Sequence, residues 1–253
     1  MGGKRKLRED ERGGQNIYNH HSVEHEMWGS SGSNSRQRNR SSSARGQSSR
    51  ASTVNEAAVL KMFSAYADDE EPNVATMEGI CKLAEDIDID PMEDRRILVL
   101  LWKLGAKEKP AQISKQEWSK GCAKLQIDSI DKVKALLPSL DTGFLLEDDF
   151  KDFYKFTFQF NREGTHRTLD KELVIGLLKM VLEGRVDEER LSSFAEFLEQ
   201  LSGEANSRVT LDQWTSFLEF CIECKDIETD YDEDTSAWPV LLDEYVEYMK
   251  SRH

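Results

Sequence analysis

The chain has 253 residues, which suits one or two domains, and its 48 acidic side chains outnumber its 34 basic ones to give a formal net charge of −14. No apolar run reaches the ~18–20 residues of a membrane-spanning helix, and no apolar segment follows the N-terminus as in a secretory signal. Four cysteines are too few for a disulfide-stapled scaffold of this length, which favours a reducing compartment. We therefore expect neither a membrane partner nor export.

The charge is divided unevenly along the chain. Residues 1–50 carry ten Lys and Arg against five Asp and Glu, a net charge of +5. Residues 51–253 carry 24 against 43, a net charge of −19. A body this acidic repels nucleic acid and attracts basic protein surfaces, with salt screening the attraction. The expected partner is therefore a protein and not a nucleic acid.

Residues 1–54 are predicted to be a disordered basic tail rich in Ser, Arg and Gly. The segment from Gly29 to Ser52 offers no large apolar side chain to bury, so it cannot form a packed core. The cluster Lys4–Arg8 has three interpretations: a nuclear import signal, a contact for an anionic surface, or an ordinary solvated charge run. The expected location is the nucleus, the cytoplasm or both.

The body, residues 55–250, is predicted to be all helical and to form two packed halves, at about 55–140 and 141–250. Apolar residues recur at helical spacing through both halves, and no segment shows the sustained alternation or the Asn-Gly turn of a β-hairpin. We therefore expect no strands.

Short helices with tight connections fill the first half. Pro91 suits the first turn of a helix, and Gly105 suits the C-cap of the same helix. Ser114 and Glu117 fit a capping box that opens the next one. Pro138 is expected to stop the last helix of this half. The predicted helices lie at about residues 55–67, 77–87, 91–104, 114–125 and 130–137.

The second half begins near Asp141 with a helix that ends at Phe160 and is aromatic on several faces. Such a helix is buried on several sides, and we expect it to be the central helix shared by both halves. Helices at about 168–183 and 187–202 follow. A capping box at Thr210 opens another helix, and the last one begins at Ser236-Ala-Trp-Pro, after an acidic loop.

The motifs of common enzyme classes are missing from the sequence. It contains no phosphate-binding glycine loop, no G-x-S-x-G and no H-E-x-x-H. Within the body, His166 is the one histidine before the last residue, and its polar loop suits a solvated side chain better than an active-site base. Cys221 and Cys224 form a C-x-x-C without the second pair that zinc needs or the βαβ context of a redox site. Both are expected to be structural thiols, with Cys221 facing the core and Cys224 at its edge.

Calcium is the metal to test in so acidic a helical protein. The first half is expected to resemble an EF-hand in shape, and its best match to the calcium loop is Asp86-Ile-Asp88-Ile-Asp90. Pro91 then occupies the required Gly position and Ile97 the required bidentate Glu position. The sequence therefore predicts no calcium site, no other metal and no cofactor.

Four segments of the body resemble the potentiating-neddylation domain of the defective-in-cullin-neddylation family. Residues 150–160 (Phe-Lys-Asp-Phe-Tyr-Lys-Phe-Thr-Phe-Gln-Phe) look like its central aromatic helix, and Tyr231–Tyr245 is similar to its C-terminal signature. Ser114–Trp118 and Asp128–Lys134 look like segments of its N-terminal half. The resemblance covers about residues 57–250.

The resemblance implies a scaffold-type ligase component with no catalytic nucleophile of its own. Such a scaffold holds the C-terminal domain of a cullin, within a cullin-RING ligase complex, beside the conjugating enzyme that carries the ubiquitin-like neddylation modifier. The thioester then faces the acceptor lysine of the cullin, and proximity and orientation supply several kcal/mol. Some members add a small ubiquitin-binding domain, which residues 1–50 are too poor in apolar side chains to form.

The resemblance assigns cullin contact to Asp212, Ala237 and Asp243. Each residue also has an ordinary structural interpretation. Asp212 is expected in the first turn of a helix, where the helix dipole favours a carboxylate, and Asp243 fits an ordinary solvated acid near a helix start. Ala237 is small and precedes the bulky Trp238.

A second site implied by the resemblance is an apolar pocket for the acetylated N-terminal Met of the conjugating enzyme. Acetylation removes a charge that is costly to bury. The alternative is plain core packing, because apolar residues at helical spacing usually face a core. The matching positions are Met77, Ile80, Ile97, Leu100, Leu101, Leu104, Ile113 and Phe160.

Two other hypotheses stay open at this point. One is a degenerate EF-hand-like helical adaptor that binds another basic partner and has no neddylation role. The other is a thiol enzyme that uses Cys221 and Cys224. Cullin binding separates the first from the scaffold hypothesis, and cysteine replacement separates the second.

Overall fold

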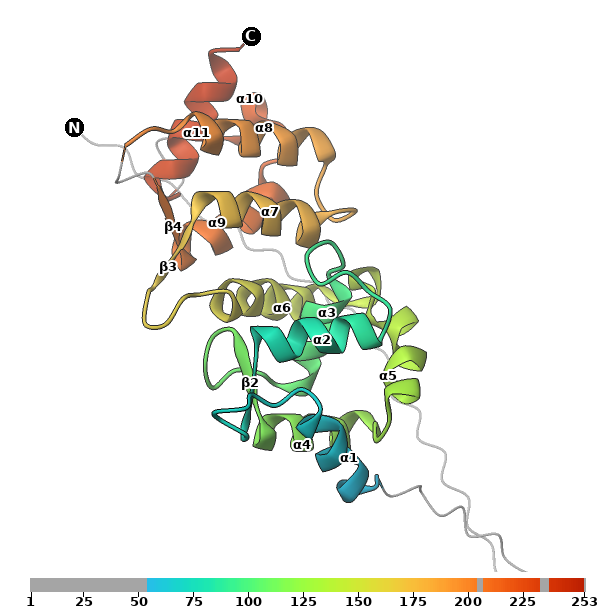
Figure 1. The fold of residues 1–253 in the computed structure, drawn as a ribbon. Helices are drawn as coiled ribbons and strands as arrows, with labels where there is room; N and C mark the ends of the chain where they lie inside the picture. Colours follow the sequence, from blue (N-terminus) through green and yellow to red (C-terminus); the bar gives the residue numbers. More distant parts are fainter. Residues whose placement is uncertain (1–53, 204–206, 233–236, 253) are drawn as a thin grey trace, which may run out of the picture. The chain divides into compact units, whose positions relative to one another are not determined.

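The computed structural model describes residues 54–203, 207–232 and 237–252, which belong to one folded unit (Figure 1). The predicted basic tail, residues 1–53, lies outside the described residues, so its predicted disorder and the location inferred from it stay predictions. Val54, which the sequence places at the end of the tail, packs against the hydrophobic core. The folded unit therefore includes it.

Helices dominate both halves, and the predicted all-helical fold class is confirmed with the addition of short strands. The first half contains α1 (Glu56–Ser64), β1 (Val74–Thr76), α2 (Met77–Asp86), α3 (Arg96–Leu104), β2 (Gln112–Ser114), α4 (Lys115–Leu125), α5 (Ile130–Leu136) and the 3-10 helix η1 (Leu137–Leu140). The second half contains the 3-10 helix η2 (Thr142–Phe144), α6 (Glu147–Phe160), β3 (Thr168–Asp170), α7 (Lys171–Leu182), α8 (Glu188–Gln200), β4 (Arg208–Thr210), α9 (Leu211–Glu223), α10 (Ile227–Asp230) and α11 (Val240–Lys250).

The strands were not expected, and each half has one antiparallel pair. In the first half β1 pairs with β2, with Ala75 opposite Ile113. In the second half β3 pairs with β4, with Leu169 opposite Val209. These four side chains are buried, so each pair ties two helix starts to the core. Three residues are too few to show the alternation by which a strand is recognised in sequence.

Local sequence signals explain most of the helix ends. Gly105 has φ of 85° at the C-cap of α3, a conformation that glycine adopts without a Cβ clash. Both predicted capping boxes form, at Ser114 and at Thr210. The prediction for Pro91 is wrong, since α3 begins only at Arg96. The side chain of Asp94 accepts hydrogen bonds from the backbone and guanidinium of Arg96 and fixes this later start.

Two short helices add to the predicted elements. The helix α5 ends at Leu136, before Pro138 as predicted, and the 3-10 helix η1 follows it and includes Pro138. The predicted acidic loop before the last helix contains the short helix α10. The side chain of Asp226 caps α10, and Asp230 accepts hydrogen bonds from the backbone of Lys225 and Asp226.

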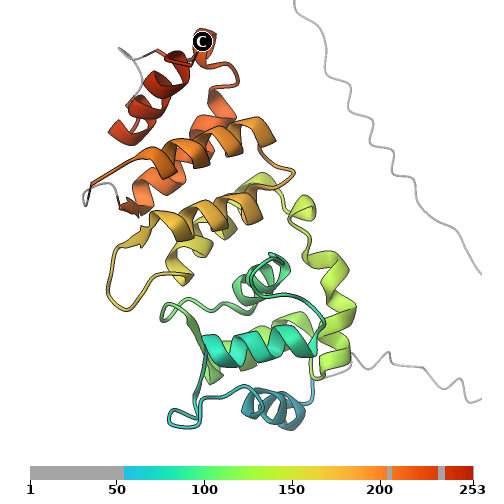
Figure 2. The same cartoon turned by 45° about the horizontal axis from the view of Figure 1, so that its top comes forward.

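The central helix α6 joins the two halves, as predicted, and contacts α3 on one side and α9 on the other (Figures 1 and 2). Seven of its side chains are buried, which accounts for aromatic residues on several faces. Tyr154 of α6 stacks on Trp214 of α9, with ring centroids 4.4 Å apart and planes 12° apart. The Tyr154 hydroxyl donates to the Trp214 carbonyl at 3.0 Å, and the Trp214 indole donates to the Tyr154 carbonyl at 2.9 Å.

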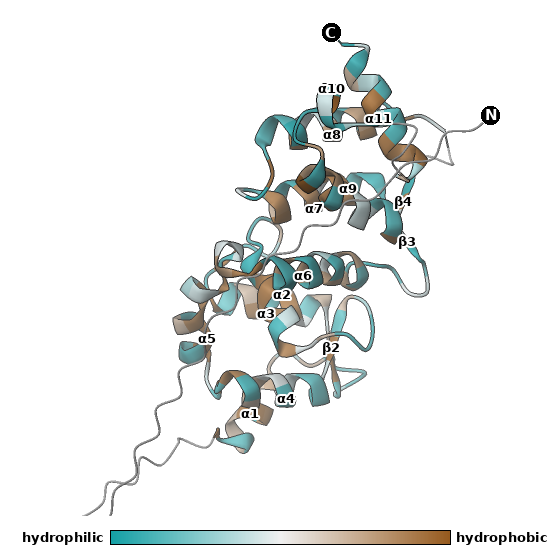
Figure 3. Ribbon diagram, turned by 180° about the vertical axis from the view of Figure 1, so that it is seen from behind, coloured by the Kyte–Doolittle hydropathy of each residue, from teal (hydrophilic) through white to brown (hydrophobic). Residues whose placement is uncertain are grey.

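The buried apolar residues of the other helices belong to the same hydrophobic core. Figure 3 shows apolar character concentrated along α3 and α7, both of which bury six side chains. In the first half α4 packs against α1 and α3, and in the second half α8 packs against α7 and α11.

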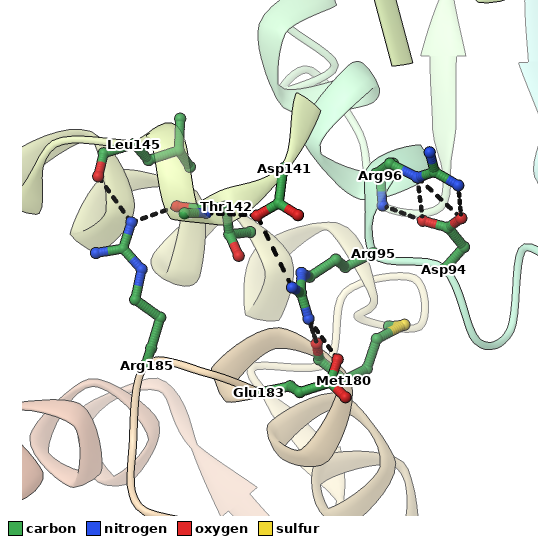
Figure 4. Close-up of polar contacts among 10 residues, drawn as sticks. Asp94, Arg95, Arg96, Asp141, Thr142, Leu145, Met180, Glu183 and Arg185 are labelled. Atoms are coloured by element: carbon green, nitrogen blue, oxygen red, sulfur yellow. Dashed lines mark hydrogen bonds and ion pairs between the residues drawn. The ribbon is translucent and has the colours of Figure 1, made fainter. Parts of the chain in front are cut away.

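Two arginines fasten the connection between the halves (Figure 4). Arg95, before α3, donates to the Glu183 carboxylate after α7 at 2.7 Å. Arg185 donates to the backbone carbonyls of Thr142 and Leu145, the latter at 2.7 Å. The Arg95 contact crosses from the first half to the second, whereas the Arg185 contacts hold the start of the second half to the loop after α7, so both restrict movement near the junction.

Substituting Gly121 by Ala is expected to lower the free energy of unfolding by about 1–3 kcal/mol, because the packing of α3 on α4 leaves no room for a methyl group. A Cβ at Gly121 would lie 2.5 Å from the Leu104 Cα. Gly176→Ala in α7 is the matched control, since no atom lies within 4 Å of its added Cβ. It should raise the free energy of unfolding by about 0.5–1 kcal/mol. Urea unfolding followed by circular dichroism measures both, and shifts of the same sign would contradict this account of the helix crossing.

Candidate functional site: an acidic surface on α9 and α11

The first residue of the proposed cullin site, Asp212, is exposed in the first turn of α9. Asp212 lies between Thr210 and Gln213, the two residues of the capping box. The Thr210 hydroxyl accepts a hydrogen bond from the Gln213 backbone N–H at 3.2 Å, and the side-chain carbonyl of Gln213 accepts one from the Thr210 backbone N–H at 2.9 Å. This local geometry fixes the helix start and leaves the Asp212 carboxylate in solvent. A carboxylate there is also favoured by the helix dipole.

Asp243 lies in the first turn of α11 and is half-buried. The Tyr231 hydroxyl donates to its carboxylate at 2.6 Å. Tyr231 packs in turn against Phe220 of α9, with ring centroids 6.4 Å apart, and the ammonium group of Lys250 lies 5.4 Å from the Tyr231 ring centre. Asp243 is therefore held in place by an aromatic residue from outside its own helix.

Ala237 is exposed and precedes α11. The next residue, Trp238, packs edge-on against Phe220, with centroids 5.6 Å apart and planes 86° apart. Pro239 is the N-cap residue of α11. Ser236, which precedes Ala237, lies outside the described residues.

Two of the three residues, Ala237 and Asp243, are connected to Phe220 through a neighbouring aromatic side chain. Phe220 contacts both Tyr231, which holds Asp243, and Trp238, which follows Ala237. Asp212 stands eight residues before Phe220, about 12 Å along the axis of α9 at 1.5 Å per residue. The sequence prediction named the three surface positions but missed the supporting roles of Tyr231 and Phe220, although Tyr231 opens the C-terminal segment of the resemblance.

The eight residues proposed for the acetyl-Met pocket lie in the first half and at the end of α6. Met77 is 40% exposed, and the other seven are buried core residues. The backbone of Ala111 donates to the Phe160 carbonyl at 2.7 Å, which closes the loop before β2 onto the end of α6. The structure therefore packs these side chains as core with one exposed member, and the pocket stays a prediction.

The comparisons with known proteins concern the same part of the chain. The family model described as cullin binding matches residues 132–248, which contain Asp212, Ala237 and Asp243. DCN1-like protein 5 of Rattus norvegicus and of Homo sapiens are each 37% identical over 193 residues, covering 76% of this chain and 77% of each relative. The chain belongs to the DCN1-like family of cullin-binding proteins.

Membership of this family confirms the resemblance found in the sequence. The similarity to the relatives covers more of the chain than residues 132–248, the region that the family model matches. DCN1-like protein 3 of Drosophila melanogaster is 34% identical over 202 residues, which is 79% of this chain and 58% of that relative. Cullin binding in a neddylation-related role is therefore the function of this DCN1-like protein at the level the comparisons reach.

The thiols of this DCN1-like protein do not suit nucleophilic catalysis. Burial raises the pKa of Cys221 to about 12, and it also raises the pKa of Cys224, despite the opposing effect of Arg190 on both. Both side chains are buried, as expected of structural thiols. A thiol with a raised pKa is protonated near neutral pH, which weighs against the thiol-enzyme hypothesis.

The acidic residues of the EF-hand-like segment serve other purposes. Asp86 accepts from the Tyr66 hydroxyl at 2.8 Å, Asp88 pairs with Lys134 at 2.5 Å, and Asp90 accepts from the backbone of Met92 at 2.8 Å. Within residues 54–203, 207–232 and 237–252, no group of three or more His, Cys, Asp or Glu could hold a metal ion. No described helix is long and apolar enough to span a membrane.

Proposed function

We propose that this DCN1-like protein is a non-covalent scaffold that promotes transfer of the ubiquitin-like neddylation modifier from its conjugating enzyme to a cullin. The observation that carries the proposal is the family membership together with the position of Asp212, Ala237 and Asp243 within the cullin-binding match. The body's net charge of −19 favours association with a basic cullin surface.

Each of the three positions has a different role at the proposed interface. Asp243 is oriented by Tyr231, so it offers a carboxylate of fixed direction to a cullin lysine or arginine. Asp212 adds a second carboxylate in solvent, and Ala237 leaves room for close approach of the cullin backbone. A charge-assisted hydrogen bond to a held carboxylate is stronger than one to a mobile carboxylate, because less conformational entropy is lost on binding.

The conjugating enzyme is proposed to insert its acetylated N-terminal Met among the apolar residues around Met77 and Phe160. Entry at this point requires the buried side chains there to separate, with the exposed Met77 as the first contact. A free amino group would carry a charge into this environment, so acetylation is expected to be required for tight binding. The scaffold itself supplies orientation and no covalent step.

A single-turnover transfer assay tests the proposal. The conjugating enzyme, charged with the modifier, is mixed with a cullin C-terminal domain in the presence and absence of the full-length chain. We expect acceleration of about tenfold or more, from proximity and orientation, and a loss of most of it when the enzyme's N-terminus is unacetylated. The Cys221→Ser, Cys224→Ser double variant should accelerate transfer as well as the wild-type chain does.

Calorimetry of the same chain with the cullin domain separates the possible failures. Binding without acceleration would contradict the conjugating-enzyme part of the proposal and leave the cullin part standing. Absence of cullin binding would overturn the proposal and favour the adaptor hypothesis. Activity that disappears in the cysteine variant would favour the thiol enzyme.

A further inference from the structure

One stretch of the acidic body is positively charged. Between Lys103 and Lys124 the chain has six Lys and two Glu, a net charge of +4 within a body whose net charge is −19. One of the two acids, Glu117, is buried and accepts hydrogen bonds from the backbone of Lys107, Glu108 and Ser114. Its carboxylate is therefore occupied within the fold and offers little compensation at the surface.

Four of these lysines line one groove between the end of α3, the body of α4 and the first turns of α6. The groove has a volume of about 430 Å³. We call it the lysine groove and define it by Lys103, Lys107, Lys120 and Lys124. Trp102 also lines it, as do Asp149 and Asp152 of α6.

Most of the lysine charge has no carboxylate partner. Lys107 pairs with Asp152 at 3.4 Å, whereas the ammonium groups of Lys103, Lys120 and Lys124 form no ion pair with any described residue. Lys103 lies 5.4 Å from the centre of the Trp102 ring. Lys120 and Lys124 are four residues apart on α4, where two like charges destabilise a helix.

Helix stability accounts for only part of this arrangement. Lys103 and Lys124 stand in the last turns of α3 and α4, where the helix dipole favours a cation. The dipole gives no reason for Lys107 and Lys120, and it does not require the four side chains to share a groove. In a chain with 43 acidic side chains after residue 50, unpaired lysines gathered in one place point to an anionic ligand.

The Trp102 side chain in the groove is held by a hydrogen bond and a ring contact. The Trp102 indole donates to the Asp152 carboxylate at 2.8 Å and packs edge-on against Phe153 at a centroid distance of 5.9 Å. This hydrogen bond, with Lys107 and Lys155 nearby, lowers the pKa of Asp152 and keeps it ionised and engaged. Gly121 permits the close crossing of α3 and α4 that brings lysines from both helices together. A ligand would therefore meet a surface that is already formed.

We propose that the lysine groove binds an acidic peptide segment of a protein partner. Three unpaired ammonium groups match three or four carboxylates on an extended peptide, and the Trp102 ring offers an apolar contact between them. Nucleic acid fits less well, because its phosphates continue past the groove onto a body of net charge −19. A short acidic peptide ends where the groove ends.

The lysine groove shares no lining residue with the acidic surface of the cullin site. Its lysines belong to the first half and are proposed to select acidic ligands, whereas Asp212 and Asp243 belong to the second half and are proposed to select basic ones. Its failure as a binding site would leave the proposed neddylation function untouched.

Fluorescence anisotropy with the full-length chain tests the proposal, using a fluorescein-labelled peptide of four glutamates spaced by glycine and leucine. Saturable binding is expected at low salt, weakening steadily as salt is added. The Lys120→Glu, Lys124→Glu double variant should bind at least about tenfold more weakly, since like charges then face the peptide. The Lys61→Glu, Lys179→Glu variant changes the net charge equally, at exposed positions of α1 and α7, and should stay within about twofold of wild type.

Both variants keep the basic residues 1–50, so a difference between them reports on the groove and not on the tail. Circular dichroism and the cullin affinity of the Lys120→Glu, Lys124→Glu variant check that it is folded. Equal weakening in both variants would overturn the proposal in favour of a general charge effect, and so would absence of saturable binding to wild type. Tighter binding of a single-stranded oligonucleotide of equal charge would overturn it in favour of a nucleic-acid site.

Discussion

Ala237→Arg is expected to weaken cullin binding by at least about a hundredfold while the fold persists, because it adds a long cation to the surface that is proposed to receive a basic partner. Like charges brought together at an interface cost several kcal/mol. Reversing both acids, with Asp212→Lys and Asp243→Lys, should have an effect of the same order. Calorimetry with a cullin C-terminal domain measures both. Ala237 is exposed, so the added side chain meets no core residue in the free protein.

Glu199→Lys is the matched control for these variants, since Glu199 is an exposed acid on α8 in the same half. It should change cullin affinity by no more than the general loss of negative charge, about twofold to fourfold at physiological salt. Near-normal affinity in the folded Asp212→Lys, Asp243→Lys variant would refute the assignment of the site. A loss as large with Glu199→Lys would show that charge alone, without a defined site, drives association.

Trp214→Ala is expected to lower the free energy of unfolding by about 3–5 kcal/mol, the largest effect on stability that we predict. The substitution removes a buried indole that stacks on Tyr154 and donates to the Tyr154 carbonyl at 2.9 Å. It also removes a contact with Phe158 of the same central helix. Because α6 is shared by both halves, the loss should weaken the whole folded unit. Urea unfolding, followed by circular dichroism, measures it.

Trp214→Phe separates the ring from the hydrogen bond. It keeps an aromatic ring near Tyr154 and deletes the indole donor, so a smaller loss of about 1–3 kcal/mol is expected. Similar losses for both variants would mean that the stacking contributes little. A second unfolding transition in Trp214→Ala would mean that α6 does not couple the halves as described.

Signals that are local in sequence predicted the structure well. The capping boxes at Ser114 and Thr210, and the C-cap at Gly105, depend on side chains within a few residues, and they form as expected. The helix start predicted at Pro91 is wrong because two nearby aspartates, Asp90 and Asp94, stabilise a turn there by accepting backbone hydrogen bonds. The propensity of a single residue yields to such bonds when they are available.

Features that depend on distant residues could not be predicted. The strand pairs join segments nearly forty residues apart, and three residues carry no recognisable pattern. The helical spacing of apolar residues identified the buried side chains from Ile80 to Leu104. It cannot distinguish a packed core from a ligand pocket, because both are lined by the same apolar helix face. At the cullin site, the resemblance named Asp243, whereas the bond from Tyr231 depends on how the chain returns after α10.

The strand pairs and capping boxes, taken together, show that the chain contains one structural unit twice. In each half a strand leads directly into a helix, pairs with a second strand, and that second strand ends in a capping box followed at once by a buried tryptophan, Trp118 or Trp214. The Trp214 indole has a hydrogen-bond acceptor, whereas the Trp118 indole has none among the described residues.

This repetition gives the two copies comparable positions with opposite chemistry. Counting from each capping residue, Asp212 of α9 corresponds to the neutral Gln116 of α4, and Lys120 and Lys124 of α4 correspond to Ser216 and Phe220 of α9. The same helix of a repeated unit therefore presents carboxylate in one copy and ammonium groups in the other. On the two proposals made above, pseudo-symmetric architecture with divergent charge would let a single chain of modest size bind two partners of opposite charge at separate surfaces.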